Sequence, residues 1–402
     1  MTGKNVLISG LGVAGPTLAF WLRAAGFRPT LVEQTPTIRS GGYVVDFWGF
    51  GYEVAERMGL RDEIDRIGYH IREMRIVNKR GKRVAGFGTS VFLELTGGRY
   101  VTIARSTLSH LLFDKIKDRA EIIFGDEIHS LRESDDCIEV QLERGGQRRF
   151  DLVVGADGLH SKVRRLVFGS QYRFEKRLGY SVAAFEARGY RPRDEDVYVV
   201  YNDPSYMVGR VTLRNDRALF LFVFASEPDA SATPDLAGQK AMLRARFGHK
   251  AWECRQILDA LERTDDLYFD RVSQIRIPRW SQGRIALVGD AAYCVSLMAG
   301  QGSALAITGA YVLAGELAQA SGDHVGAFAN YEKVLRAFIE TKQRGAERFA
   351  AAFAPKTSWG VFLRNQVIRA TAIPGIARLS FGRGIVDKLQ LPEYRWGDFS
   401  HP

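Results

Sequence analysis

Three glycines near the start of the chain constrain its fold more than any other feature. Gly10, Gly12 and Gly15 follow a short apolar run and precede a helical pattern, which a second apolar run follows. Strand–helix–strand order of this kind predicts a parallel sheet. Gly10 permits a tight turn, Gly12 lets the backbone approach a pyrophosphate, and Gly15 allows close packing of helix on strand. The loop therefore predicts a dinucleotide site at a helix N-terminus, where free N–H groups attract phosphate.

An acidic residue ends the second predicted strand. Glu33 stands 23 residues after Gly10, and its carboxylate can accept both hydroxyls of an adenosine ribose. Val13 and Ala14, within the glycine loop, belong to the same predicted site. The pattern does not distinguish FAD from NAD, and a glycine-rich turn without a ligand is the alternative.

Two later segments also end an apolar run with a polar turn. Asp157 and Gly158 precede a short helix that Ser161 can cap, and a plain strand-to-helix turn is the alternative reading. Gly289 and Asp290 end a nearly continuous apolar run, which suits a strand buried on both faces. Asp290 should then lie at the carboxyl end of the sheet, where ligands bind, and a buried acid there needs a partner.

Residues 171–270 differ from the rest of the chain in the spacing of their apolar residues. Several of their apolar runs alternate with period two, which predicts an inserted domain rich in antiparallel strands. Phe220, Phe222 and Phe224 share one face of such a run and could form the floor of a substrate pocket, as could Met207. Ordinary core packing is the alternative for each of them.

Length and composition set broader limits. The 402 residues suit two interleaved domains and a tail, and the net charge of +10 is scattered rather than clustered, which favours small anionic ligands over nucleic acid. Cys137, Cys254 and Cys294 are far apart, which argues against disulfides and against a metal site. No signal peptide and no apolar run of ~18 residues is present, so a cytoplasmic protein without integral membrane association is expected.

The three motifs, in this order and spacing over residues 1–320, resemble the fingerprints of the FAD-dependent aromatic hydroxylases, the single-component flavoprotein monooxygenases typified by para-hydroxybenzoate hydroxylase. The segments "GRIALVGDAAYC" and "GAYVLAGEL" most resemble the branch of tetracycline-inactivating and polyketide-tailoring monooxygenases. The resemblance implies an α/β fold: a Rossmann-like FAD-binding domain with a parallel sheet, interleaved with an antiparallel-sheet substrate domain and followed by a C-terminal helical tail. The expected segments are 1–75, 101–170 and 271–345 for the FAD-binding domain, 76–100 and 171–270 for the substrate domain, and 346–402 for the tail.

The resemblance also assigns roles to residues. Arg105 matches an arginine that contacts FAD, Asp290 matches the acid that holds the ribityl chain, and Asp157 matches a motif linked to both FAD and NAD(P)H. The helix that begins at Gly302 would direct its N-terminus at the pyrimidine edge of the flavin, where reduced flavin is anionic. The expected cofactor-binding set is Gly10, Gly12, Val13, Ala14, Gly15, Glu33, Arg39, Arg105, Asp157, Gly158, Gly289, Asp290, Gly300, Gln301, Gly302 and Ser303.

The activity that the resemblance implies is hydroxylation of a phenolic or polycyclic aromatic, polyketide-like small molecule. FAD would be bound non-covalently in a monomer or homodimer, with NAD(P)H and O2 as co-substrates and a flavin C4a-hydroperoxide as the oxidant. No side-chain base is identifiable, and His160 is the residue to test first. A flavin-dependent reductase or dehydrogenase, or a flavin-binding protein with little hydroxylation, is the alternative.

Four positions depart from the family pattern. Tyr293 stands where the family usually has histidine, Leu297 where it has proline, Ala304 where it has asparagine, and Gly309 where aspartate is frequent. All four lie close to the segment expected to hold the flavin. They make FAD binding a firmer expectation than hydroxylation.

The tail is basic and amphipathic over residues 357–389. It is expected to pack its apolar side across the two domains, and a membrane surface is the alternative. In the packed arrangement Phe362, Val367, Ile368, Ile376 and Leu379 would be buried.

Overall fold

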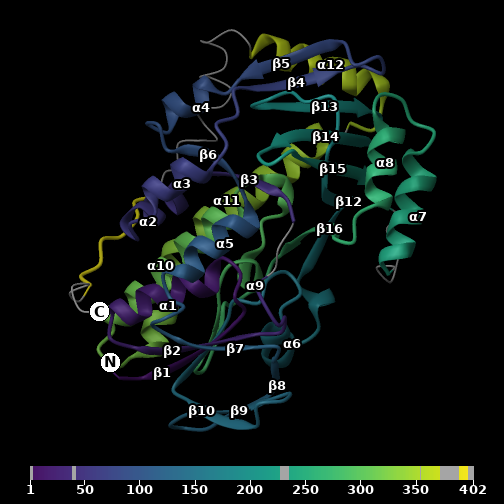
Figure 1. Ribbon diagram of the computed structural model, residues 1–402. Coiled ribbons are helices and arrows are strands. Elements are labelled where there is room, and N and C mark those ends of the chain that lie inside the picture. Colours follow the sequence, from purple (N-terminus) through teal and green to yellow (C-terminus); the bar gives the residue numbers. More distant parts are fainter. Residues whose placement is uncertain (1–2, 39–41, 227–234, 354, 372–388, 397–402) are drawn as a thin grey trace.

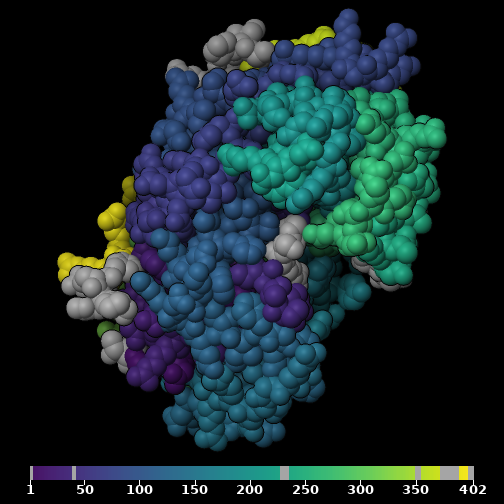
Figure 2. Space-filling view, viewed as in Figure 1, coloured from purple at the N-terminus to yellow at the C-terminus, as the bar shows by residue number. Residues whose placement is uncertain are grey.

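The computed structural model describes residues 3–38, 42–226, 235–353, 355–371 and 389–396. A mainly parallel sheet lies at one end and a larger, mainly antiparallel sheet at the other, with the long helices α10 (Gly302–Gln319) and α11 (His324–Phe353) running between them (Figure 1). In Figure 2 the teal and green surface of the antiparallel part lies above the blue surface of the parallel part. The expected fold class is confirmed, whereas the expected division into domain segments stays a prediction.

The parallel sheet has the strand order β17-β18-β11-β1-β2-β7, in which every pair except β17–β18 is parallel. Helix α1 (Ala14–Ala24) follows β1 and also packs against α10. Apolar residues on both faces of β1 are completely buried, as a covered parallel strand requires. The strands are β1 (Asn5–Ser9), β2 (Arg28–Glu33), β7 (Glu121–Phe124), β11 (Leu152–Gly155), β17 (Ser281–Gln282) and β18 (Ile285–Leu287).

The second sheet has the order β16-β12-β15-β14-β13-β4-β5, with β13–β4 as its one parallel pair among the described residues. Helices α7 (Leu236–Phe247) and α8 (Cys254–Glu262) cover one face, and the other face turns toward the parallel sheet (Figure 1). The strands are β4 (Glu73–Val77), β5 (Arg83–Gly88), β12 (Glu175–Arg188), β13 (Val197–Asp203), β14 (Tyr206–Leu213), β15 (Arg217–Ala225) and β16 (Tyr268–Ile275).

Shorter elements join the two sheets. β3 and β6 form an antiparallel pair between them, and β8, β9 and β10 form a small outer sheet. The remaining elements are β3 (Val44–Trp48), α2 (Phe50–Arg57), α3 (Arg61–Ile67), α4 (Ser90–Leu95), β6 (Tyr100–Ala104), α5 (Arg105–Asp114), β8 (Ile128–Glu133), β9 (Ile138–Leu142), β10 (Gln147–Phe150), α6 (Lys162–Phe168), α9 (Asp290–Tyr293) and α12 (Ser358–Ala370).

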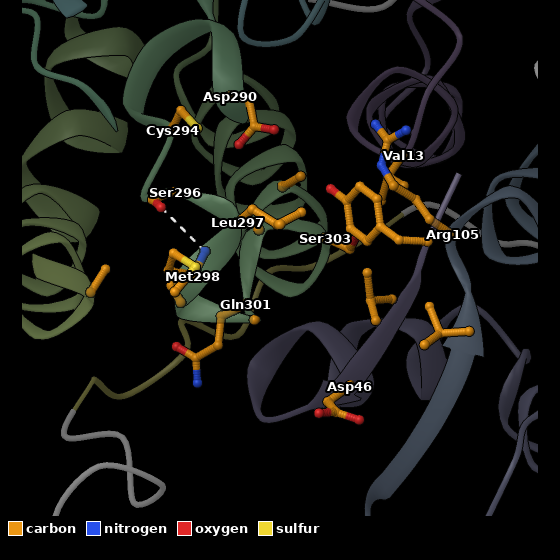
Figure 3. A pocket seen from close by; sticks show the side chains of 18 of the residues that line it. Val13, Asp46, Arg105, Asp290, Cys294, Ser296, Leu297, Met298, Gln301 and Ser303 are labelled. Carbon is orange, nitrogen blue, oxygen red and sulfur yellow. Dashed lines mark hydrogen bonds between the residues drawn. The ribbon is translucent and has the colours of Figure 1, made fainter. Parts of the chain in front are cut away.

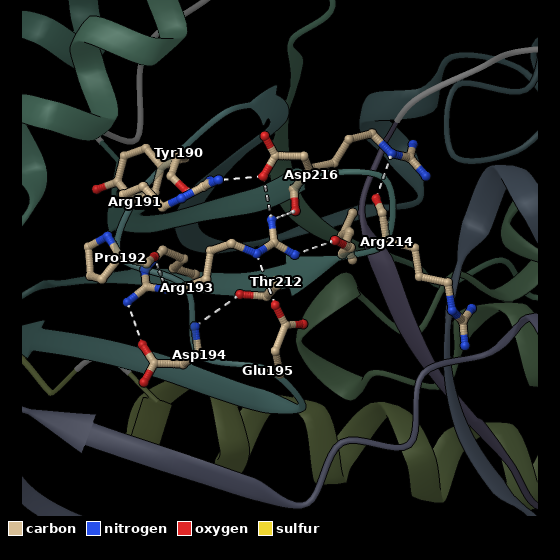
Figure 4. A network of polar contacts seen from close by, with 12 residues as sticks. Tyr190, Arg191, Pro192, Arg193, Asp194, Glu195, Thr212, Arg214 and Asp216 are labelled. Atoms are coloured by element: carbon tan, nitrogen blue, oxygen red, sulfur yellow. Dashed lines mark hydrogen bonds and ion pairs between the residues drawn. The ribbon is translucent and has the colours of Figure 1, made fainter.

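An ion-pair network fastens the connection between β12 and β13 (Figure 4). Arg191 and Arg193 both contact Oδ1 of Asp216, at 2.8 and 3.2 Å. The buried Arg210 donates to Oδ2 of Asp194 at 2.8 Å. Because a buried charge is stable only when it is paired, the contact of Arg210 with Asp194 ties the segment just before β13 to β14.

The expectation for the tail is wrong in part. Helix α12 lies along β5 at the sheet edge, and the side chains of Phe362 and Val367 are 49% and 57% exposed. Ile368 is half-buried, and Ile376 and Leu379 lie outside the described residues. The physical reason is that, within the part of the chain that the structure describes, α12 packs against the edge of one sheet and not between two domains. Among the described residues, none of the helices combines the length and apolar character needed to cross a membrane.

Candidate cofactor and substrate site

One large cavity lies between the carboxyl ends of the parallel strands and the inner face of the antiparallel sheet. Its volume is about 1950 Å³, and part of its wall is drawn in Figure 3. Pockets for a single drug-sized ligand are usually ~300–1,000 Å³. The space is therefore sufficient for a dinucleotide together with a second molecule.

The glycine loop forms one end of the cavity, as the sequence indicates. Gly10 has φ +107°, and a Cβ there would lie 2.6 Å from the Ala156 carbonyl oxygen. A Cβ on Gly15 would lie 2.0 Å from the Gly10 carbonyl oxygen, so neither position admits a side chain. At Gly12 the nearest atom to such a Cβ is Nη2 of Arg105, at 3.7 Å. The loop thus keeps its backbone open toward the cavity and next to a cation, which fits a pyrophosphate.

Glu33 ties the end of β2 to this loop. Its Oε2 accepts a hydrogen bond from the Leu11 amide at 2.9 Å, and its Oε1 accepts from the amide and hydroxyl of Thr35 at 3.1 and 2.9 Å. The residue lines the cavity beside the glycine loop. A carboxylate in this place is oriented before any ribose arrives, because backbone and hydroxyl donors hold it.

Asp157 organises the turn after β11. Its Oδ2 accepts from the amides of Lys162 and Val163 at 2.8 and 3.0 Å, and Ser161 accepts from the Arg164 amide at 2.9 Å. Both side chains therefore cap the start of α6, as in a plain strand-to-helix turn. Asp157 also lines the cavity with Gly158, so capping does not remove it from the site.

Asp290 lies at the start of α9, just beyond the end of β18, and lines the cavity. Burial raises its pKa, while the nearby Arg105 guanidinium and a hydrogen bond with Cys294 oppose that rise. Figure 3 shows Cys294 beside Asp290, while Arg105 lies across the cavity and acts on the acid only through its charge. Tyr43 also belongs to this cluster, and burial raises the pKa of its phenol to about 12.

The segment after α9 brings a helix start beside Asp290. A Cβ on Gly302, the first residue of α10, would lie 3.8 Å from Oδ1 of Asp290. Gly300 has φ +64° and ends the one-turn 3-10 helix that precedes α10. The first turn of α10 has no acidic side chain of its own, and Asp290 is the carboxylate that lies beside its partial positive charge.

Most of the expected cofactor-binding set lines this cavity. Gly15 and Gly289 stand behind the wall: a Cβ on Gly289 would lie 3.3 Å from the Cβ atoms of both Ala14 and Ala306, so its role is to let α1 and α10 approach each other. Arg39 lies outside the described residues. The members that line the cavity are Gly10, Gly12, Val13, Ala14, Glu33, Arg105, Asp157, Gly158, Asp290, Gly300, Gln301, Gly302 and Ser303.

Residues 4–332 match the FAD binding domain family. The chain belongs to this family. A flavin-dependent monooxygenase of Legionella longbeachae is 34% identical over 352 residues, covering 85% of this chain and 87% of the relative. An uncharacterized protein of Mycobacterium tuberculosis is 39% identical over 345 residues, covering 85% of this chain and 92% of the relative. The resemblance to FAD-dependent aromatic hydroxylases is confirmed, and FAD is the dinucleotide that this family binds.

Solved structures agree with this assignment. The tetracycline destructase Tet(55) has a TM-score of 0.83 and 32% identity, covering 98% of this chain and 100% of that one. HpxO of Klebsiella pneumoniae, complexed with FAD and uric acid, has a TM-score of 0.78 at 21% identity, covering 95% of both chains, and shows the fold alone.

The phenylalanines expected to form a substrate floor lie on the wrong side of the sheet. Phe220, Phe222 and Phe224 are buried against α7 and α8, and the rings of Phe222 and Phe247 are 4.9 Å apart. Side chains alternate along a strand, so the residues between them face the cavity instead. The cavity-facing residues of β15 are Leu219, Leu221 and Val223.

The end of the cavity under the antiparallel sheet is largely apolar, and sequence reasoning missed most of it. Met207, which was expected, lines it, together with side chains from β4, β5 and β13. Arg364 of α12 also faces it, and burial lowers the pKa of this guanidinium to about 10. The apolar wall includes Met74, Ile76, Phe87, Phe92, Val200 and Val211.

His160 also lines the cavity. Its Nε2 lies 3.2 Å from Oδ2 of Asp270, and its Nδ1 lies 3.2 Å from the Gln171 amide nitrogen. The hydrogen bond with Asp270 raises the pKa of the imidazole. The pair connects the turn before α6 with β16, and hence the two sheets.

Two of the four departures from the family pattern form a single contact. A Cβ on Gly309 would lie 1.8 Å from the Tyr293 hydroxyl oxygen. That hydroxyl is 3.2 Å from the Tyr331 hydroxyl, which donates to the Leu287 carbonyl at 3.1 Å. Tyr293 therefore requires glycine at position 309, and neither residue lines the cofactor cavity.

The other two departures have different surroundings. Ala304 packs against α2, where a Cβ on Gly51 would lie 2.3 Å from the Ala304 Cα. Leu297 lines the cavity, and it is the one of the four that does (Figure 3). Direct effects of the departures on the cofactor surroundings are thus confined to Leu297.

Proposed function

We propose that this protein is an FAD-dependent monooxygenase that hydroxylates a phenolic or polycyclic aromatic small molecule, using NAD(P)H and O2. The observation that carries the proposal is one continuous cavity that joins the glycine loop to an apolar chamber under the antiparallel sheet. A cofactor held at the first end would have its reactive part directed at a molecule held at the second. The similarity to tetracycline destructases supports a polyketide-like substrate.

The residues present fit FAD. The open backbone at Gly12 with Arg105 beside it would hold the pyrophosphate, Glu33 the adenosine ribose, and Asp290 the ribityl hydroxyls. The start of α10 at Gly302 would stabilise negative charge at the adjoining edge of the ring system. When bound, FAD supplies the electron-transfer and oxygen chemistry, and the protein contributes binding, orientation and exclusion of water.

The apolar chamber suits a flat aromatic molecule. Met207 and Leu221 lie on its sheet wall and Arg364 on the opposing helix α12. Apolar surface would exclude water from the reacting ring. We further propose that NAD(P)H approaches the turn at Asp157, and that the protein acts in the cytoplasm as a monomer or homodimer.

The FAD content of the purified protein, its NAD(P)H oxidation and its incorporation of oxygen into substrate together test the proposal. The purified protein is expected to be yellow, to release FAD on denaturation, and to oxidise NAD(P)H faster with an aromatic substrate while incorporating an oxygen atom from isotopically labelled O2. Hydrogen peroxide as the sole oxygen product with every aromatic compound in a broad panel would refute hydroxylation and favour a flavin-dependent reductase.

A further inference from the structure

A carboxylate on β3 lies in the cavity wall, outside the cofactor-binding set. Asp46 is the direct cross-strand neighbour of Thr102 on β6, and the Thr102 hydroxyl donates to Asp46 Oδ1 at 2.7 Å. Tyr100 lies two residues before Thr102 on the same face of β6 and interacts with Asp46, and Tyr198 of β13 interacts with both Thr102 and Asp46. Three strands thus gather four hydrogen-bonding side chains, of which Asp46, Tyr100 and Tyr198 line the cavity.

The surroundings of this cluster are apolar. Met74 on β4 and Val211 on β14 are the strand neighbours of Tyr198, and both line the cavity. Figure 3 shows Asp46 in the cavity wall on a strand separate from the segment that carries Asp290 and Leu297. Asp46 is therefore available to a molecule in the substrate chamber, while Asp290 belongs to the cofactor end.

Only one group of the cluster can accept a proton near neutral pH. Burial raises the pKa of the Tyr100 and Tyr198 phenols far above the usual value, so both stay protonated and act as donors. Burial also raises the pKa of Asp46, while the Thr102 and Tyr100 hydroxyls oppose that rise, and no basic group contributes to it. A carboxylate with a raised pKa is closer to the range in which general bases work best.

We propose that Asp46 recognises a hydroxyl group on the aromatic substrate and accepts its proton. This inference rests on the proposed function and narrows its substrate to phenols or enols. In the step, the O–H bond of the substrate breaks, its electron pair stays on the substrate oxygen, and the proton moves to the Asp46 carboxylate. The resulting phenolate ring is more electron-rich, and thus more reactive toward an electrophilic oxygen atom, and the proton returns to solvent or product afterwards.

The other acids of the cavity are engaged elsewhere. Asp270 faces His160 at 3.2 Å, and Asp157 caps α6. Arg364, on α12, lies in the same cavity and would favour the anionic form of the substrate. Asp46 is thus the acid whose place suits the substrate rather than the cofactor.

A binding measurement on the FAD-loaded protein without NAD(P)H tests the proposal. 2-Naphthol can donate a hydrogen bond from its hydroxyl, whereas its methyl ether, 2-methoxynaphthalene, has a methyl group in place of that hydrogen. A hydrogen bond to a charged group predicts that 2-naphthol binds at least ~10-fold more tightly than the ether. Asp46→Asn, which keeps the shape but not the basicity, is expected to reduce this preference below about 3-fold.

Asp65→Asn is the matched control, because Asp65 also accepts a hydrogen bond from a hydroxyl, that of Tyr52 at 2.6 Å, but does not line the cavity. It should leave the preference unchanged, and FAD content reports whether each variant folds. Equal binding of the two probes to the wild type, or an unchanged preference in Asp46→Asn, would overturn the proposal.

Failure of the proposed function would look different. A naphthol preference that depends on Asp46, without oxygen incorporation into any phenol, would refute hydroxylation and keep Asp46 as the proton acceptor. Normal oxygen incorporation by Asp46→Asn would keep hydroxylation and remove Asp46 from it. A proton-acceptor role also predicts that Asp46→Asn loses the acidic limb of the pH profile for substrate-stimulated NAD(P)H oxidation.

Discussion

Replacing Gly309 with alanine is expected to destabilise the protein strongly, because the added methyl group would occupy the place of the Tyr293 hydroxyl. The Cβ would lie 1.8 Å from that oxygen and 3.0 Å from the adjoining ring carbon. Tyr293 cannot yield easily, since it is 2% exposed and its ring packs 4.6 Å from that of Trp280. Overpacking costs ~1–3 kcal/mol and loss of the hydrogen bond to Tyr331 about 1 kcal/mol more. A loss of about 2–4 kcal/mol is therefore expected.

Urea unfolding at saturating FAD measures this loss, and a double-mutant cycle with Tyr293→Phe tests its cause. Tyr293→Phe removes the clashing oxygen, so the double variant should be at least about 1 kcal/mol more stable than the sum of the single changes predicts. The reasoning is refuted if Gly309→Ala unfolds like the wild type, or if the two changes are additive.

Three further predictions follow from the site. Gly15→Ala should abolish FAD loading, measured as the FAD-to-protein ratio, because the Cβ would lie 2.0 Å from the Gly10 carbonyl; a fully loaded variant would contradict this. Phe222→Ala should lower the free energy of unfolding by ~3–5 kcal/mol with little effect on binding of naphthalene probes, and Leu221→Ala should do the reverse, weakening probe binding at a smaller cost in stability. Because hydrogen bonding to Asp270 raises the pKa of His160, the ion pair should stabilise fully below the usual histidine pKa and fade as pH rises through the raised value. The stability difference between the wild type and His160→Gln should thus shrink from pH 6 to 9 and stay below about 1 kcal/mol, since the imidazole is largely exposed; a difference that grows with pH would be contrary.

The cofactor end could be predicted because its residues follow a rule of chain geometry. The carboxyl ends of neighbouring parallel strands meet at one edge of the sheet, so Gly10, Glu33 and Asp157 had to converge once their strands were recognised. Asp290 follows the next strand, β18, and the start of α10 returns to the same edge. Local spacing was enough for these residues.

The apolar end of the cavity could not be predicted in the same way. Period-two alternation separates Phe222 from Leu221, but it does not say which of the two faces has helices packed on it. The contact between Tyr293 and Gly309 joins residues of two helices and depends on how α9 and α10 cross. The role proposed for Asp46 depends on the register between β3 and β6, which places Asp46 opposite Thr102. No short sequence motif encodes that register.

The order of strands along the chain has a consequence for how such a protein can change. β1 and β2 of the parallel sheet precede β4 and β5 of the other, β7 and β11 follow, and β18 comes after β12–β16. Neither sheet is therefore encoded by one continuous stretch of sequence that a single recombination event could exchange between genes. A new substrate range is expected to arise from individual substitutions on the cavity side of the antiparallel sheet, where each changes the chamber without moving the cofactor.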